Sequence, residues 1–333
     1  MHIKDKKILI TGGAGFIGHH LVKRLAPNNQ LTILDNYRRG IPRRLDEIKD
    51  IDLLNIDITD SIALNKINDQ YDILIHLAAI NGTSNFYDRP IEVMDVGVKG
   101  IINILDFCTQ KNIKKVIVAS SAEVYQAPKV IPTPEDVELI VPTHTNPRYS
   151  YGLSKIFTEF YSMHYSSKNK DISISIFRPH NVYGEDMGYK HVIPEIILQF
   201  FAAHSADKKS IEIVPKGPVN SERSFCYISD ILDGIELISD RSVQGVFNIG
   251  NPVSTKIIDI FNYISTLTNI NYSLKASRDE HPGSVARRIP DIKKISYLGY
   301  IPKVDINSGL HKTLDWYFSN ESLIKNEMKN IYL

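Results

Sequence analysis

The sequence of 333 residues is poor in several features that mark specialised classes of protein. Its two cysteines, Cys108 and Cys226, stand far apart in apolar or aromatic segments, which argues against a disulfide framework and a cysteine-based metal site. No apolar run approaches the 18 residues typical of a membrane-spanning helix. The first residues also lack the apolar core of a signal peptide, so we expect a soluble, cytoplasmic protein.

Charge of one sign is not in excess either. Lys and Arg together number 39 and Asp and Glu number 38, which gives a net charge of +1. A near-neutral chain has no broad electrostatic attraction to polyanions, so neither nucleic acid nor a membrane is an expected partner. Any phosphate group must therefore be bound at a local site.

The first half of the chain alternates between two kinds of apolar pattern. Short runs rich in Ile, Leu and Val predict buried strands at residues 7–11, 31–34, 53–56, 73–77, 116–119 and 172–177. Apolar residues at helical spacing occur between these runs, at residues 16–25, 62–68, 91–109 and 151–166. Because parallel strands need crossover connections, this alternation predicts an α/β fold with a doubly wound parallel sheet.

The second half has a different rhythm, in which Pro and Gly recur after Pro179. Helical segments such as residues 193–203 are separated by irregular stretches, and GVFNIG at 245–250 predicts one more strand. The segment 302–318 ends in an amphipathic helix. We therefore expect a smaller C-terminal lobe that binds substrate and is partly interleaved with the sheet.

A glycine-rich loop joins the first predicted strand to the first predicted helix. Its sequence is TGGAGFIG, residues 11–18. Glycine permits the tight turn and the close approach of backbone to a pyrophosphate, and the helix N-terminus attracts phosphate. Gly12, Gly15 and Gly18, with Phe16 and Ile17 at the helix start, are thus candidate cofactor-binding residues. The alternative is a tight strand-to-helix turn without a ligand.

An acidic residue, Asp35, closes the second predicted strand and is followed by Asn36. A carboxylate at this point accepts hydrogen bonds from the ribose hydroxyls of adenosine and repels a 2′-phosphate, which favours NAD over NADP. Arg38 and Arg39 leave NADP open as the less favoured cofactor.

A second acidic residue, Asp57, follows the third predicted strand together with Ile58. This pair is placed to reach the edge of an adenine ring. The other interpretation is that Asp57 orders the loop before Thr59 and Asp60, as a turn or capping residue does.

Candidate catalytic residues lie at the fifth strand and on the helix that follows. Tyr151 and Lys155 are four residues apart, so they share one face of a helix, and an ammonium group beside a tyrosine favours its phenolate. Ser121 and Glu123 follow the fifth strand, whose carboxyl end faces the ligand crevice of a doubly wound sheet. The alternatives are a capping role for Ser121 and a structural ion pair for Glu123.

These motifs together resemble the extended short-chain dehydrogenase/reductase family, and within it the NAD-dependent nucleotide-sugar epimerases and dehydratases. The resemblance covers nearly the whole chain and includes further segments: HLAA at 76–79, SS at 120–121, RPHNVYG at 178–184, RSFCYISD at 223–230, FNIG at 247–250 and RRIPD at 287–291. It implies an NAD-binding Rossmann-type domain of residues 1–178 plus about 223–250. Residues 179–222 and 251–333 would form the lobe that binds a nucleotide sugar.

The resemblance also implies roles for individual residues. Contacts with a tightly bound NAD are implied for Gly12, Gly15, Phe16, Ile17, Gly18, Asp35, Asn36, Asp57, Ile58, Ala78, Ala79, Tyr151 and Lys155. Contacts with the substrate are implied for Ser121, Glu123, His180, Asn181, Arg223, Arg287 and Arg288. Among the latter, Arg223 with Arg287 or Arg288 would hold the substrate diphosphate, for which a bidentate guanidinium is suited.

The reaction implied begins with oxidation of the sugar at C4 to a 4-keto species. Tyr151 would be the base, Ser121 its hydrogen-bonding companion and Lys155 the group that lowers its pKa. Glu123 would steer the later step, since a glutamate here matches the acid/base residue of 4,6-dehydratases and also occurs in decarboxylases. Ala122 stands where one dehydratase type has an aspartate. An epimerase, a dehydratase, a C4 dehydrogenase, a decarboxylase and a non-catalytic NAD-binding member of the family all remain open.

Assembly and wider role follow from the same resemblance. The predicted helices at 91–109 and 151–166 have apolar faces, and their equivalents in the family pair across a homodimer. Nucleotide-sugar metabolism and polysaccharide biosynthesis are the implied context. The histidines show no ligand spacing, and no metal site is expected.

Overall fold

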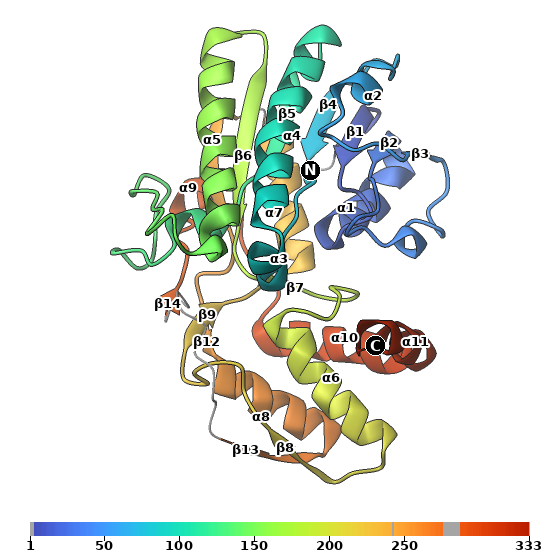
Figure 1. Ribbon diagram of the computed structural model, residues 1–333, viewed down its shortest axis with the longest axis vertical. Coiled ribbons are helices and arrows are strands. Elements are labelled where there is room, and N and C mark those ends of the chain that lie inside the picture. Colours follow the sequence, from blue (N-terminus) through green and yellow to red (C-terminus); the bar gives the residue numbers. More distant parts are fainter. Residues whose placement is uncertain (1–2, 242, 276–286, 333) are drawn as a thin grey trace.

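The computed structural model describes residues 3–241, 243–275 and 287–332. Its centre is a seven-stranded parallel sheet with strand order β11-β6-β5-β4-β1-β2-β3 (Figure 1). The strands are β1 Lys7–Thr11, β2 Gln30–Leu34, β3 Ile51–Leu54, β4 Ile73–His76, β5 Lys115–Ala119, β6 Ser173–Pro179 and β11 Gly245–Ile249. The doubly wound α/β fold expected from the sequence is confirmed.

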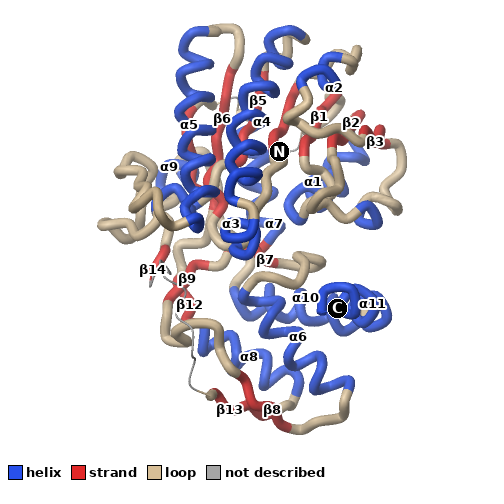
Figure 2. Tube along the Cα trace, viewed as in Figure 1, coloured by secondary structure: helices blue, strands red, loops and turns tan. Residues whose placement is uncertain are grey.

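Helices cover both faces of this sheet. They are α1 Phe16–Leu25, α2 Ser61–Asn65, α4 Pro90–Gln110, α5 Ser150–Lys168 and α7 Ile228–Asp240. Successive side chains of a strand point to opposite faces, so Ile8 and Ile10 of β1 join the apolar core under α1 and α7, whereas Leu9 joins the core under α4. Figure 2 shows α4 and α5 side by side in front of the sheet.

The remaining elements form the smaller lobe and the connections. The lobe contains helices α6 Val192–Ser205, α8 Ile257–Thr268, α10 Ile306–Ser319 and α11 Glu321–Tyr332. Its short strands pair as β7 Val182–Tyr183 with β10 Cys226–Tyr227, β8 Ser210–Ile213 with β13 Asn271–Leu274, and β9 Glu222–Ser224 with β12 Ser254–Lys256 and β14 Arg287–Arg288. Short helical segments in the loops are η1 Ala26–Asn28, η2 Pro42–Arg44, α3 Thr83–Asp88, η3 Ala122–Tyr125, η4 Pro147–Tyr149 and α9 Lys293–Ser296. None of the helices in the described ranges is long and apolar enough to cross a membrane.

The third strand differs from its prediction, because β3 begins at Ile51 and ends at Leu54, two residues earlier than expected. It is the edge strand of the sheet, and Leu53 is 45% exposed. Side chains of an edge strand are partly exposed, so the apolar residues in the sequence do not mark the ends of such a strand reliably. The boundaries of the two expected domains stay a prediction.

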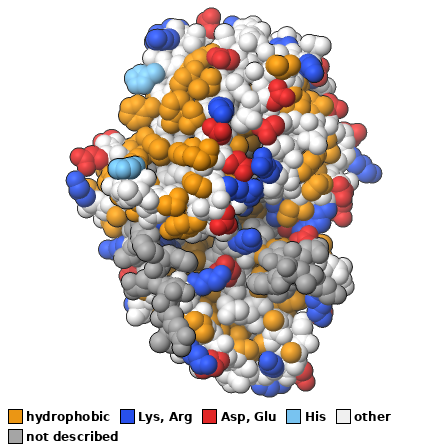
Figure 3. Space-filling view, viewed as in Figure 1, with side chains coloured by type: hydrophobic (Ala, Val, Ile, Leu, Met, Phe, Trp, Pro, Cys, Tyr) orange, Lys and Arg blue, Asp and Glu red, His pale blue; other side chains and the backbone are white. Residues whose placement is uncertain are grey.

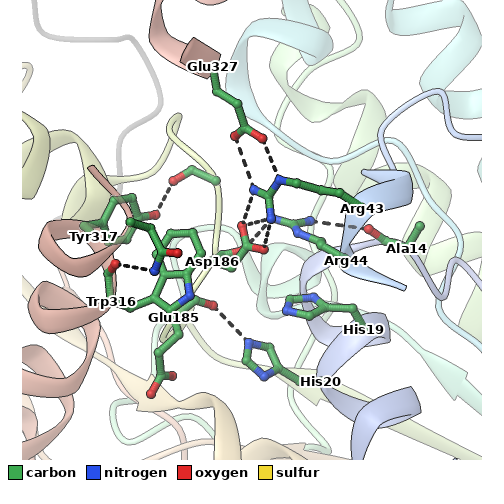
Figure 4. A network of polar contacts seen from close by, with 12 residues as sticks. Ala14, His19, His20, Arg43, Arg44, Glu185, Asp186, Trp316, Tyr317 and Glu327 are labelled. Carbon is green, nitrogen blue, oxygen red and sulfur yellow. Dashed lines mark hydrogen bonds and ion pairs between the residues drawn. The ribbon is translucent and has the colours of Figure 1, made fainter. Parts of the chain in front are cut away.

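A network of ion pairs ties the sheet to the C-terminal lobe (Figure 4). The guanidinium of Arg43 lies 2.8 Å from Asp186 (Nη1 to Oδ2) and 2.7 Å from Glu327 of α11 (Nε to Oε1). Arg44 pairs with the same aspartate, Nη2 to Oδ1, at 3.1 Å. Beside this network is a cavity of about 1300 Å³, into which His19 and His20 of α1 project. The two parts of the chain are therefore joined by buried or half-buried charges as well as by apolar packing.

Candidate active site

The crevice at the carboxyl ends of the strands is shaped by the glycine loop. Gly12 has a φ of +75°, and a Cβ there would lie 2.7 Å from the backbone nitrogen of Ala78. A Cβ on Gly18 would overlap the carbonyl oxygen of Gly12 and lie 2.7 Å from the Cα of Gly13. Helix α1 begins after Gly15 without a side-chain cap, so its first N–H groups are available to an anion. The loop thus fits a dinucleotide pyrophosphate.

Asp35 lies at the end of β2, where its carboxylate is fixed by two backbone donors. The N–H of Ala14 donates to Oδ2 at 3.0 Å and the N–H of Tyr37 donates to Oδ1 at 2.8 Å. Burial raises the pKa of this carboxyl, and the two N–H donors oppose that shift. Each oxygen keeps a lone pair that a ribose hydroxyl can use. The position therefore fits the adenosine ribose of NAD.

Asp57 serves the local loop. Its Oδ1 accepts hydrogen bonds from the N–H and hydroxyl of Thr59 at 2.8 and 2.7 Å, and its Oδ2 accepts one from Asn36 at 2.9 Å. Burial opposes ionisation, but these hydrogen bonds hold the pKa of Asp57 below its ordinary value. The interpretation of Asp57 as a loop-ordering residue is what the geometry supports. Contact of Asp57 and Ile58 with adenine stays a prediction.

Tyr151 and Lys155 lie on one face of α5, directly above the end of β5. The Tyr151 ring stacks on Phe86 of α3 with 5.1 Å between ring centroids, and the side chain of Ser121 is near enough to its hydroxyl to lower the pKa of the phenol. Lys155 donates from Nζ to the carbonyl oxygen of Ala119 at 2.7 Å, and Nζ lies 5.8 Å from the Tyr151 ring centroid. The structure therefore brings together three residues that the sequence predicted as a catalytic group.

The ionisation of this group follows from its burial. Burial and the charge of Glu123 raise the pKa of Tyr151 well above its ordinary value, while Ser121 and Arg39 oppose the shift. Burial lowers the pKa of Lys155 to about 8, although Glu159 opposes this. The phenol is thus neutral in the chain alone, and a further positive charge beside it would favour the phenolate.

Glu123, in η3, is surrounded by arginines. Its Oε1 lies 2.6 Å from Nη1 of Arg288, which is buried and also donates to the carbonyl oxygen of Gln126 at 3.3 Å. Burial opposes ionisation of Glu123, but Arg288, with Arg148 and Arg223 nearby, holds its pKa below the ordinary value. The site therefore holds an ionised carboxylate among three cations.

A buried polar network lies beneath these residues. Arg178 of β6 forms a two-point ion pair with Glu159 of α5, with Nε–Oε1 at 2.7 Å and Nη2–Oε2 at 2.5 Å. Ser120 donates to the same glutamate. Arg178 also donates to the hydroxyl of Tyr125 at 2.5 Å. The network fixes α5, and with it the catalytic face, against the sheet.

The residues predicted to contact substrate differ in their burial and in their partners. Asn181 donates from Nδ2 to the carbonyl oxygen of Ser224 at 2.7 Å and is half-buried. Arg223 is half-buried beside Glu123 and Arg288, and burial lowers its pKa to about 10. Arg287 pairs with Glu222 at 3.1 Å and is exposed. A diphosphate contact for these arginines stays a prediction.

His180 is fully buried, and its contact with substrate stays a prediction. Its side chain has no exposed surface, and its Nε2 lies 3.2 Å from Oδ1 of Asn248. Burial lowers the pKa of its imidazole to about 3. The geometry gives no support to a substrate contact by His180, which instead belongs to the buried network under the site.

Two residues near the site, Phe86 and Arg148, were not found from the sequence, and a third, Arg39, was considered only as a contact of a 2′-phosphate. Phe86 packs on Tyr151, Arg148 approaches Glu123, and Arg39 approaches Tyr151 from the loop after β2. Arg148 stands three residues before Tyr151 on the chain, which was an available signal. Nothing in the pattern around Phe86 distinguished it from core.

Comparison with known proteins was informative at the level of family and fold. The family model described as NAD dependent epimerase/dehydratase family matches residues 8–250. A putative UDP-glucose 4-epimerase of Methanocaldococcus jannaschii is 32% identical, over 94% of this chain and 99% of its own length. A UDP-N-acetyl-alpha-D-glucosaminuronate decarboxylase of Bacillus cytotoxicus is 31% identical, over 94% of this chain and 98% of its own. The solved UDP-N-acetylglucosamine 4-epimerase of Methanobrevibacter ruminantium superimposes with a TM-score of 0.83 at 26% identity, covering 95% of this chain and 99% of that one.

Proposed function

The chain belongs to the NAD-dependent epimerase/dehydratase family, and we propose that it oxidises a nucleotide-activated sugar at C4 to a 4-keto species. The observation that carries this proposal is the placement of Tyr151, Ser121 and Lys155 together beside the crevice of the glycine loop. A base, its hydrogen-bonding companion and a neighbouring cation are the groups that removal of a hydroxyl proton needs.

In the proposed reaction, the O–H bond at C4 breaks and its proton passes to the phenolate oxygen of Tyr151. Ser121, whose side chain lies beside that oxygen, holds the sugar hydroxyl and the phenol in line. Lys155, as its ammonium form, stabilises the phenolate. Bound NAD supplies the acceptor for the hydride that leaves C4.

Asp35 supports NAD over NADP, because its carboxylate lies where a 2′-phosphate would have to be placed. The arginine best placed to counter this repulsion, Arg38, is 2.7 Å from Glu92 and so already has an anionic partner. We therefore propose NAD as the cofactor, bound tightly enough to be reduced and reoxidised in place.

The second step depends on Glu123. Because Arg288 keeps this carboxylate ionised, Glu123 is suited to accept a proton and unsuited to donate one. Ala122 offers no second acid to the leaving hydroxyl that a dehydration needs. The geometry thus disfavours a 4,6-dehydratase and leaves 4-epimerisation, release of the ketone and decarboxylation.

Decarboxylation of a nucleotide-linked uronic acid is the second candidate, and the arginines favour it. Arg148, Arg223 and Arg288 outnumber the one carboxylate of Glu123, so the site is suited to an acidic sugar. Oxidation at C4 would make that sugar a β-keto acid. The bond from C5 to the carboxyl carbon would then break, carbon dioxide would leave, and the electron pair would pass into the enolate before a proton returns to C5.

Replacement of Tyr151 tests the first step. We expect Tyr151→Phe to lower the rate of cofactor reduction by roughly a hundredfold or more, because general acid–base groups contribute about that much. The NAD bound per chain should be unchanged, and Tyr161→Phe on the same helix is the matched control. If Tyr151→Phe reduces the cofactor as fast as the wild type, Tyr151 is not the base. If neither protein reduces it, the chain is a non-catalytic NAD-binding member of the family.

A panel of nucleotide sugars decides between the later steps. The panel should contain neutral hexoses and the corresponding uronic acids, each followed by absorbance of reduced cofactor and by product mass. An isomer identifies an epimerase, loss of carbon dioxide a decarboxylase, loss of water a dehydratase and loss of two hydrogens a dehydrogenase. If none of these sugars is converted, the proposed function fails.

A further inference from the structure

The loop after β2 folds back over the glycine loop. The N–H of Ile41 donates to the carbonyl oxygen of Ala14 at 3.0 Å. A Cβ on Gly40 would lie 2.8 Å from the Cβ of Ala14 and 2.6 Å from Oδ1 of Asp35. The backbone at Gly40 is therefore in direct contact with two parts of the cofactor crevice, the phosphate-binding turn and the ribose-binding carboxylate.

From this position the side chain of Arg39, an exposed residue, reaches the loop after β4. Its Nη1 donates to the carbonyl oxygen of Asn81, and both terminal nitrogens lie 3.9 Å from the Cβ position of Gly82. Its charge also acts on Tyr151 at the catalytic end of the crevice. The guanidinium thus lies at the loop that follows β4, and its charge is felt by the base.

Arg39 differs from its arginine neighbours in its partners. Arg38 and Arg89 pair with Glu92, and Arg43 and Arg44 pair with Asp186, so each has a carboxylate. For Arg39 the structure shows no carboxylate partner among residues 3–241, 243–275 and 287–332. A cation with only a carbonyl contact retains most of its donors for a ligand.

We propose that Arg39 is a cofactor-binding residue that holds the diphosphate of the dinucleotide on its nicotinamide side. This inference rests on the proposed NAD site. A diphosphate carries two negative charges, whereas the N-terminus of α1 offers the equivalent of about half a positive charge. The guanidinium fork supplies the missing charge together with two parallel N–H donors.

The place of the guanidinium separates this role from recognition of a 2′-phosphate. A 2′-phosphate would lie at the ribose, beside Asp35. The Arg39 guanidinium is instead at Asn81, on the side of the crevice that leads to Tyr151. Arg39 therefore binds a group common to NAD and NADP and does not distinguish between them.

The test is a set of binding measurements on the full chain. NAD, ADP-ribose and AMP are titrated calorimetrically into the wild type, Arg39→Gln and Arg39→Lys, with Arg38→Gln as the matched control. We expect Arg39→Gln to weaken NAD and ADP-ribose by roughly ten- to a hundredfold, because both contain the nicotinamide-side phosphate. AMP lacks that phosphate, so its affinity should change less than about threefold, and Arg39→Lys should restore part of the loss.

Three results would overturn the inference. They are an unchanged affinity for ADP-ribose in Arg39→Gln, an equal loss for AMP, and a loss confined to NADP when NADP is titrated alongside. The proposed function fails separately: if the wild type binds NAD but converts no nucleotide sugar, the reaction is wrong while the Arg39 measurement still stands. Conversely, if the wild type converts a nucleotide sugar but Arg39→Gln binds ADP-ribose as tightly as the wild type does, only this inference is overturned.

Discussion

At the scale of single residues, the site is governed by a carboxylate that works against the base it accompanies. Glu123 contributes to the raised pKa of Tyr151, second only to burial. Arg288 compensates part of the charge of Glu123 at 2.6 Å and thereby keeps it ionised. The negative charge of Glu123 opposes formation of the Tyr151 phenolate, so it does not help the first proton transfer. We therefore assign Glu123 to the chemistry after C4 oxidation.

Glu123→Gln should therefore affect the two steps differently: C4 oxidation should proceed at lower pH, and the step after it should stop. Loss of the negative charge lowers the pKa of Tyr151, so the phenolate forms at lower pH. The acidic limb of cofactor reduction should move to lower pH by roughly one unit, because a nearby charge shifts a pKa by about that amount. The later step should be blocked, so the 4-keto species accumulates. Single-turnover absorbance across pH and product mass measure the two effects.

Glu195→Gln is the control for this substitution, since Glu195 of α6 pairs with the exposed Lys216. A pH profile and product profile equal to those of the wild type would remove Glu123 from the mechanism. A shift of the limb to higher pH would show that the charge of Glu123 stabilises the phenolate, which contradicts the geometry.

Sequence reasoning was effective for residues whose role depends on chain spacing. Tyr151, Lys155 and Ser121 were predicted because their spacing on a helix and a strand end places them together. The contact of Arg39 with Asn81 and the pairing of Glu123 with Arg288 were not predicted, because they join segments 42 and 165 residues apart. Only the folded backbone fixes such distances.

At the scale of elements, the critical contact is the packing of α1 against the turn that precedes it. Gly18 is inside α1, where alanine would ordinarily stabilise the helix by about 1 kcal/mol. At this position the added methyl group would overlap the carbonyl oxygen of Gly12 and press on Gly13. The cost of the overlap and the gain in helix propensity thus have opposite signs.

We expect the overlap to prevail in Gly18→Ala. Overpacking costs about 1–3 kcal/mol, so the free energy of unfolding in urea should fall, and the NAD retained per chain should fall with it. Gly217→Ala is the matched control, since a Cβ there meets no atom within 4 Å. A Gly18→Ala chain as stable as the wild type would mean that α1 can move away from the turn.

The bounds of helices and strands were predicted more accurately where the element is more deeply buried. The strands covered on both faces and α1 were predicted within about two residues, since continuous apolar runs report burial directly. The edge strand β3 was misplaced, and α7, α8 and α11 were not predicted. All of α7 lies within 223–250, a segment in which only the final strand was recognised. The helix was missed because acidic and serine side chains interrupt its apolar face.

At the scale of the whole molecule, one helix in the described part of the chain presents an apolar face that the fold does not cover. Leu153, Phe160 and Met163 of α5 are 42%, 58% and 38% exposed. Their spacing of seven and three residues places them on one face of the helix. Figure 3 shows hydrophobic side chains gathered over the upper part of the molecule, where α4 and α5 lie. We propose that this face forms the homodimer interface expected from the sequence.

A single charge should prevent that assembly. In a two-fold symmetric interface the same residue is present on both sides, so Phe160→Glu introduces two carboxylates into an apolar contact. Sedimentation should give twice the chain mass for the wild type and the chain mass for Phe160→Glu. Circular dichroism and thermal unfolding should show that the variant is folded, since Phe160 lies at the surface. Ile62→Glu, at a 72% exposed apolar residue of α2, should remain dimeric. A dimeric Phe160→Glu chain would place the interface elsewhere, and a monomeric wild type would show that the exposed face of α5 serves another contact.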